Sequence, residues 1–100
     1  MAVMEVSVIP IGTGSSVSSY VADCIRVPKK AKVSYELTAM GTNVEGNLQE
    51  LVRLALQMHR VPFKKGAQRV VTTIKIDDRR DKKISIAGKK RAVQRKLVRR

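Results

Sequence analysis

Acidic, amide and hydroxyl side chains alternate with apolar residues in several short segments of this sequence. Successive side chains of a β-strand point to opposite sides, so this alternation predicts a sheet with one polar face. Glu5, Glu36 and Glu45 would share that face with hydroxyl groups. Carboxylates in a partly desolvated place favour a bound cation or a hydrogen-bonded amine, although a solvated face explains the pattern equally well. The predicted polar face comprises Glu5, Ser7, Ser34, Glu36, Thr38, Asn43, Glu45, Thr73 and Lys75.

Other residues with chemical potential carry weaker signals. The segment 12–16, Gly-Thr-Gly-Ser-Ser, resembles a phosphate-binding loop, but it lacks a third glycine and no Gly-Lys-Ser/Thr follows. We therefore favour ordinary loop and cap chemistry there. His59 has no partner that the sequence can assign and is predicted to be a surface or interface residue. Cys24 lies on a predicted apolar helix stripe and is interpreted as a small buried hydrophobe.

A cluster of aspartates follows the last predicted strand. Asp77, Asp78 and Asp81 have the carboxylates that a divalent cation needs, but Arg79 and Arg80 stand among them and compete for the same oxygens. An ion-paired turn or subunit contact is the favoured interpretation. No nucleophile–base pair and no metal-ligand set can be assembled from the sequence, so we predict neither catalytic nor metal-binding residues and no cofactor.

The periodicity of apolar residues predicts the elements that position these side chains. The N-terminal strand ends at Pro10, and the loop at 12–16 supplies caps for a helix that stops near Pro28. Two further strands form a hairpin, Asn47 caps a second helix that ends before Pro62, and Ser85 is a plausible cap for a third. The predicted ranges are strands 2–10, 33–38, 40–45 and 69–77, a first helix starting near residue 17, a second after 47 and a third at about 86–98.

The order β-α-β-β-α-β is the ferredoxin-like, split βαβ arrangement of the α+β class. It predicts a four-stranded antiparallel sheet with two helices on one side and an additional C-terminal helix. The other sheet face, which mixes carboxylates and hydroxyls with a few aliphatic side chains, is left uncovered. Such a face is too apolar for an ordinary solvent-exposed surface and too polar for a core. This indicates an interface that also binds a polar group.

The composition limits the class of protein. One hundred residues with 43% hydrophobic content predict a single domain over residues 1–100 with a thin core, which oligomerisation would support. No apolar run is long enough to cross a bilayer, and the N-terminus reads as a strand without a basic leader. We therefore expect a cytoplasmic location. A single cysteine excludes an internal disulfide and argues against a structural zinc site.

Basic residues concentrate in the second half of the chain. Residues 1–50 hold four basic and five acidic residues, whereas residues 79–100 hold eleven basic residues and one acid. A rival hypothesis is therefore a nucleic-acid-binding module that uses the segment 82–100 to neutralise phosphates. Only Tyr20, Tyr35 and Phe63 are aromatic, and none is predicted to stack bases on the open face, so such binding would be independent of sequence.

Three long stretches resemble a known family, the small thiamine-binding, YkoF-like proteins of about 100 residues. They are Val8–Val21 (VIPIGTGSSVSSYV), Tyr35–Gly46 (YELTAMGTNVEG) and Lys65–Asp81 (KGAQRVVTTIKIDDRRD). The resemblance implies a ferredoxin-like fold assembled as homodimers or homotetramers. It also implies a non-catalytic role in binding thiamine or its hydroxymethylpyrimidine part.

Thiamine is a cation with an aminopyrimidine ring, so its site would need carboxylates, groups that hydrogen-bond to ring nitrogens, and aliphatic walls. The predicted open face offers all three, between subunits. This sequence departs from the family in having basic residues where members are rich in Glu, for example at Lys90 and Arg95, which bears on its surface and partners. From the alternation of faces we expect ligand-binding residues at Glu5, Ser7, Glu36, Thr38, Asn43 and Thr73, with Ser15 and Ser18 at the rim.

Overall fold

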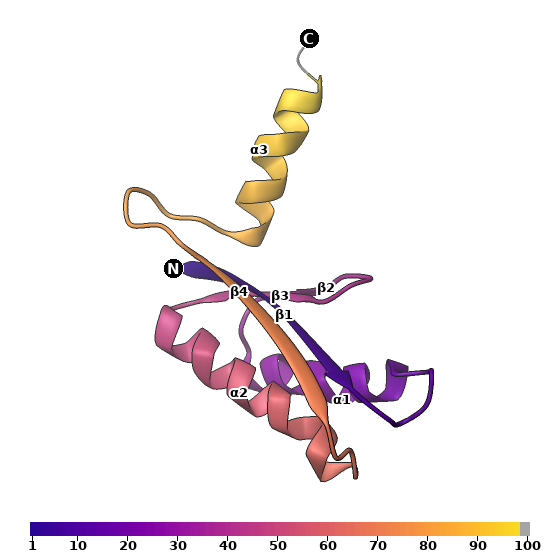
Figure 1. The fold of residues 1–100 in the computed structure, drawn as a ribbon. Helices are drawn as coiled ribbons and strands as arrows, with labels where there is room; N and C mark the ends of the chain where they lie inside the picture. Colours follow the sequence, from indigo (N-terminus) through magenta and orange to yellow (C-terminus); the bar gives the residue numbers. More distant parts are fainter. Residues whose placement is uncertain (99–100) are drawn as a thin grey trace.

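A computed structural model describes residues 1–98 of the chain, and Figure 1 shows their arrangement. Four strands form one antiparallel sheet in the order β2-β3-β1-β4. Helices α1 and α2 lie together on one side of the sheet, and α3 rises from the other side (Figure 1). The predicted ferredoxin-like α+β fold with an extra C-terminal helix is confirmed. The elements are β1 Ala2–Pro10, α1 Ser18–Ala31, β2 Tyr35–Leu37, β3 Thr42–Gly46, α2 Leu48–Lys64, β4 Val70–Asp78 and α3 Ile86–Val98.

The core lies between the sheet and the first two helices. In β1, Met4 and Val6 are 0% and 1% exposed, and they face Leu51, Leu54 and other apolar side chains of α2. The alternate residues of the same strand point to the opposite, open side, as the period-two pattern predicts. The apolar stripe of α2 is thereby buried, which is the main source of stability for a domain of this size.

Both core helices run further than the sequence predicts, because each continues through a proline. Pro28 lies inside α1 and Pro62 inside α2, each in the last turn or next to it. A proline there removes one backbone hydrogen bond, but both rings are fully buried, so apolar burial offsets the loss. Helix α1 then ends at its C-cap Lys32, which has a left-handed conformation (φ 58°) and whose N–H donates to the Lys29 carbonyl.

The caps of the helices are only partly as predicted. Asn47 caps α2, since its Oδ1 accepts a hydrogen bond of 2.8 Å from the Glu50 N–H. The expected side-chain cap of α1 was wrong: Val17 occupies that position and no side chain caps the helix. The serine and threonine side chains of the preceding loop therefore do not cap the N-terminus of α1.

The β2–β3 hairpin is shorter than predicted. Its turn is closed by Thr38, whose N–H and Oγ1 both donate to the Gly41 carbonyl, at 2.8 and 2.9 Å. Residues that alternation alone assigned to strands therefore belong to the turn, and Met40 at its tip is 85% exposed. Pairing of β3 with β1 starts only at Thr42, which lies opposite Val6.

Helix α3 is attached to the domain through its first turn. Ile84, just before it, is buried, and Ser85 caps the helix by accepting a 2.9 Å hydrogen bond from the Gly88 N–H, as predicted. A Cβ at residue 88 would lie 2.9 Å from the Ser85 Oγ, which explains a glycine in the first turn despite its helix-breaking tendency. No residue of α3 is buried. Within residues 1–98, none of the helices has the length and apolar character to cross a membrane.

Candidate functional site

The open face of the sheet carries the predicted polar residues in rows that cross the strands. One row contains Glu36 on β2, Asn43 on β3, Glu5 on β1 and Lys75 on β4, since each is the register partner of the next. In the next row, Glu45 lies opposite Val3, which in turn lies opposite Asp77. Carboxylates that are far apart in the sequence are thus neighbours on one surface.

Neighbouring side chains hold these carboxylates in place. The Asn43 Nδ2 donates to Glu36 Oε1 at 3.3 Å, and the Lys75 Nζ lies 3.7 Å from Glu5 Oε1. The Glu5 contact is long and the Lys75 side chain is 79% exposed, so it constrains the carboxylate weakly. Glu5 is therefore the acid of this row that is most available to a ligand.

The first turn of α3 lies over one end of the open face, which the sequence did not predict. The Lys90 Nζ donates to Glu36 Oε2 at 2.7 Å, the Lys89 ammonium pairs with Asp77, and the Ile86 N–H donates to Glu45 Oε2 at 2.9 Å. The Lys90 ammonium, followed by the Asn43 amide, lowers the pKa of Glu36 below its usual value. The prediction that this face is uncovered is therefore wrong at one end of the sheet. There the carboxylates of Glu36 and Asp77 are paired with lysine side chains of α3.

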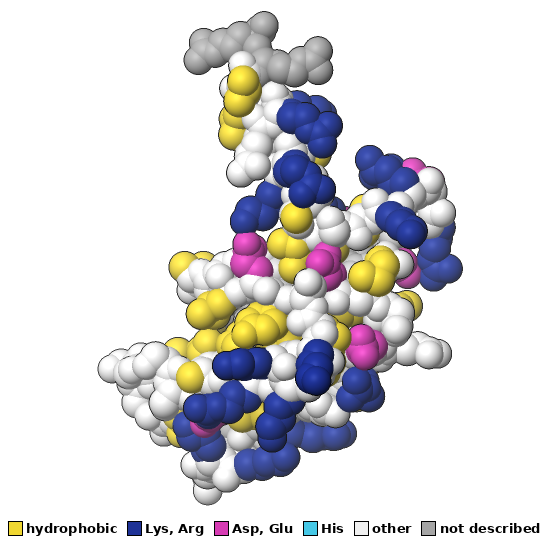
Figure 2. Space-filling view, turned by 180° about the vertical axis from the view of Figure 1, so that it is seen from behind, with side chains coloured by type: hydrophobic (Ala, Val, Ile, Leu, Met, Phe, Trp, Pro, Cys, Tyr) yellow, Lys and Arg dark blue, Asp and Glu magenta, His cyan; other side chains and the backbone are white. Residues whose placement is uncertain are grey.

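Two adjoining hollows lie where α3 meets the sheet, and they share Ile86 and Lys90. In the space-filling view of Figure 2, acidic and basic side chains lie side by side in the band between α3 and the body, next to apolar surface. The first hollow has a volume of about 560 Å³ and the second about 470 Å³. Both are in the size range of small-molecule sites. The first is lined by Val3, Glu5, Asn43, Lys75, Ile76, Asp77, Ile86, Lys89 and Lys90, the second by Ser34, Tyr35, Glu36, Glu45, Ile86, Ala87, Lys90, Arg91 and Gln94.

The remaining predicted site residues lie elsewhere. Ser7 and Thr38 line a smaller, mostly apolar hollow of about 230 Å³ beside the β2–β3 turn. Thr73 faces Ser7 across the β1–β4 pairing. Ser15 lies in the exposed loop after β1 and Ser18 is the exposed first residue of α1, and neither lines the hollows under α3. The structure thus brings together Glu5, Glu36 and Asn43 in one row, and the ligand-binding roles of all eight residues remain predictions.

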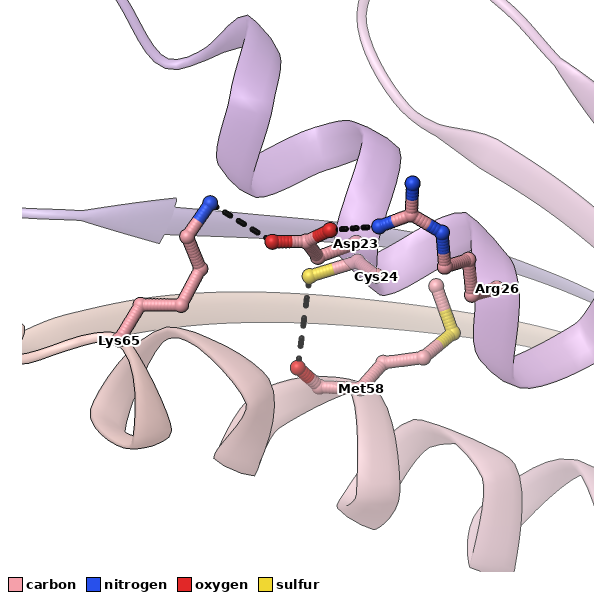
Figure 3. A network of polar contacts seen from close by, with 5 residues as sticks. All are labelled: Asp23, Cys24, Arg26, Met58 and Lys65. Atoms are coloured by element: carbon pink, nitrogen blue, oxygen red, sulfur yellow. Dashed lines mark hydrogen bonds and ion pairs between the residues drawn. The ribbon is translucent and has the colours of Figure 1, made fainter.

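Cys24 lies in a buried contact between α1 and α2, shown in Figure 3. Its Sγ donates to the Met58 carbonyl at 3.5 Å, and burial raises the pKa of the thiol to about 11. Nearby, Lys65 pairs with Asp23 at 2.6 Å and lowers the pKa of that carboxyl. A thiol that stays protonated at neutral pH is a poor nucleophile, which agrees with the interpretation of Cys24 as a buried hydrophobe.

The other candidate groups are occupied by structural contacts. Arg79 forms two 2.6 Å hydrogen bonds with Asp81, and Arg80 pairs with Asp78 at 3.0 Å, which confirms the predicted ion-paired turn. His59 Nδ1 lies 2.7 Å from the Thr72 hydroxyl, on the helix side of the sheet. In the described part of the chain, no three His, Cys, Asp or Glu side chains come together in a way that could hold a metal ion.

The sheet order and the two-helix layer define a small α+β protein of ferredoxin-like topology with a charged, half-covered sheet face. The sequence profile described as "Thiamine-binding protein" matches residues 4–94. The chain belongs to this family.

Relatives at high identity cover almost the whole chain. The UPF0045 protein YqgV of Bacillus subtilis is 44% identical over 102 residues, which cover 97% of this chain and 98% of YqgV. The solved structure of the hypothetical protein MJ1052 from Methanocaldococcus jannaschii is 42% identical, covers 93% of this chain and 95% of its own, and has a TM-score of 0.86. A Thermotoga maritima structure, described as a thiamine biosynthesis/salvage protein, shares the fold with a TM-score of 0.76 at 21% identity, covering 92% and 97% of the two chains.

Proposed function

We propose that this protein binds thiamine or a related aminopyrimidine, such as the hydroxymethylpyrimidine part of thiamine, at the open sheet face without transforming it. Membership of the thiamine-binding family supports the ligand class. The observation that carries the proposal is the 560 Å³ hollow, which combines the carboxylates of Glu5 and Asp77, the Asn43 amide and the aliphatic residues Val3 and Ile86. These are the groups that a cationic ring with hydrogen-bonding nitrogens requires.

A second copy of the chain completes the site in this proposal. Ile9 and Val71, register partners on the open face, are each 45% exposed, so aliphatic surface lies beside the polar rows. Small-molecule sites bury most of the ligand surface, and a hollow that is open on one side achieves this only with a cover. Packing two open faces together would bury the aliphatic side chains and enclose the ligand between subunits.

The side-chain contacts of the site favour binding over catalysis. The acids under α3 are held by ammonium, amide or backbone N–H groups, and the one cysteine is buried and protonated. The family description names binding and no reaction. We therefore expect thiamine to be recovered unchanged after incubation with the protein.

Titration calorimetry with thiamine tests the proposal. We expect saturable binding that is weakened about tenfold by Glu5→Gln, because a charge-assisted contact to the cation is lost. Glu36→Gln should also weaken binding. Glu50→Gln is the matched control, since Glu50 lies on α2, on the other side of the sheet. A flat titration at millimolar thiamine would refute the proposal.

The oligomeric state provides a second, independent measurement. Light scattering coupled to size exclusion should give a mass of at least twice 11.1 kDa. Ile9→Asp and Val71→Asp place a charge in the proposed interface and should shift the protein toward the monomer. Met40→Asp changes a more exposed apolar side chain at the hairpin tip and should leave the mass unchanged. A wild-type protein that stays monomeric with thiamine present would contradict the shared site.

A further inference from the structure

The hollows under α3 are electrically balanced, although a site for a simple cation would be expected to be negative. Their acidic lining consists of Glu5, Glu36, Glu45 and Asp77, and their basic lining of Lys75, Lys89, Lys90 and Arg91. Four carboxylates thus face four cations within one continuous surface. The ligand that matches such a lining carries both signs of charge.

The cations keep donors that the protein does not use. A lysine ammonium has three N–H donors, and among residues 1–98 the carboxylate partner of Lys90 is Glu36 alone, at 2.7 Å. Arg91, one residue further along α3, forms no ion pair with any described residue and has five donors. Lys90 lines both hollows, so its unused donors lie at their junction.

The basic side chains of the site and the available carboxylate of Glu5 come from different elements. Lys89, Lys90 and Arg91 belong to α3: Lys89 lines the hollow that contains Glu5, Arg91 lines the adjoining hollow, and Lys90 lines both. Glu5 belongs to β1, and among the described residues its ion pair is the long Lys75 contact. A ligand placed between them would meet carboxylate at the sheet and ammonium or guanidinium at the helix. Phosphate oxygens form charge-assisted hydrogen bonds with such groups.

We propose that the site takes a phosphate monoester of the thiamine-like ligand, with the cationic ring on the sheet carboxylates and the phosphate on Lys89 and Lys90. This inference rests on the proposed function and names the charge form of its ligand. The α3 lysines then act as specificity-determining residues. They pair with Asp77 and Glu36 and have further N–H donors for the phosphate of the ligand.

Calorimetry with thiamine and thiamine monophosphate on the full chain tests the inference, with inorganic phosphate as a third titrant. We expect the monophosphate to bind about tenfold more tightly than thiamine, because charge-assisted hydrogen bonds to the phosphate are added. Inorganic phosphate alone should bind much more weakly than the monophosphate.

Substitutions on α3 separate local recognition from overall charge. The double variant Lys89→Gln/Lys90→Gln should lose the preference for the monophosphate, and Lys90→Arg, which keeps the charge, should retain it. Arg95→Gln/Lys96→Gln is the matched control, because it removes the same charge from the same helix at residues that do not line either hollow. Circular dichroism of each variant checks that the fold is retained.

The outcomes distinguish this inference from the proposed function. Saturable thiamine binding with no preference for the monophosphate overturns the inference and leaves the proposed function intact. A preference that survives Lys89→Gln/Lys90→Gln, or that is lost equally in Arg95→Gln/Lys96→Gln, overturns the assignment to the α3 lysines. The absence of binding for both organic ligands overturns the proposed function and the inference together.

Discussion

The same chemical change at two leucines should have very different effects on stability. Leu54 of α2 is 0% exposed in the core, whereas Leu97 of α3 is 74% exposed. Leu54→Ala removes buried methyl groups and leaves a cavity, which costs about 2–5 kcal/mol in known cores. Leu97→Ala removes surface that is already in water, so its cost should stay within about 0.5 kcal/mol.

These free energies translate into a clear thermal difference. A 100-residue domain loses about 4–8 °C in Tm for each kcal/mol, so Leu54→Ala should lower the Tm by roughly 10–40 °C. Total stabilities of about 5–15 kcal/mol leave room for a folded variant at 25 °C. Leu97→Ala should shift the Tm by at most about 4 °C.

Thermal unfolding followed by circular dichroism, at two protein concentrations, measures both variants. A decrease in Tm for Leu97→Ala as large as that for Leu54→Ala would refute the reasoning. It would mean that the α3 seam is packed against a partner and that the helix does not stand free of the core. If the decrease in Tm caused by Leu97→Ala grows with protein concentration, that partner is a second copy of the chain.

Two further predictions concern a helix terminus and a carboxylate. Asn47→Ala should cost about 1 kcal/mol in urea unfolding, because the Glu50 N–H loses its cap; a cost near zero would contradict the role of that hydrogen bond. Lys90→Gln should raise the pKa of Glu36 toward 4.5 in an NMR titration of its carboxyl carbon. Since the pKa of Glu36 is lowered in the folded protein, the α3 contact should stabilise above pH about 4.5 and be lost as the pH falls through the lowered value. An unchanged pKa in Lys90→Gln would show that the ion pair does not persist in solution.

The alternation of side chains predicted the sheet well because strand faces depend on local geometry. Met4 and Val6 face the core and Glu5 faces the open side, as period two requires. The Asn47 and Ser85 caps were also predictable, since each depends on a polar side chain three residues before the N–H that it accepts from. Glu5, Glu36 and Asn43 could be assigned to one face for the same local reason.

The errors occurred where burial outweighed local preference. Proline usually ends a helix, but the rings of Pro28 and Pro62 are buried in the core, so both helices continue through them. Alternation also extended the hairpin strands into the turn that Thr38 closes with hydrogen bonds to Gly41. Neither burial nor turn closure can be deduced from the immediate neighbours in the sequence.

The sequence by itself determined the fold class and the polar face, because periodicity, caps and charge are properties of nearby residues. Only the tertiary structure decided which acids meet which bases. Glu36 and Lys90 are 54 positions apart, and their 2.7 Å contact exists because a buried Ile84 and the Ser85 cap set the first turn of α3 over the end of the sheet. Contacts between residues so far apart in the sequence depend on how the whole chain packs. They place the α3 cations beside the carboxylates of the open sheet face.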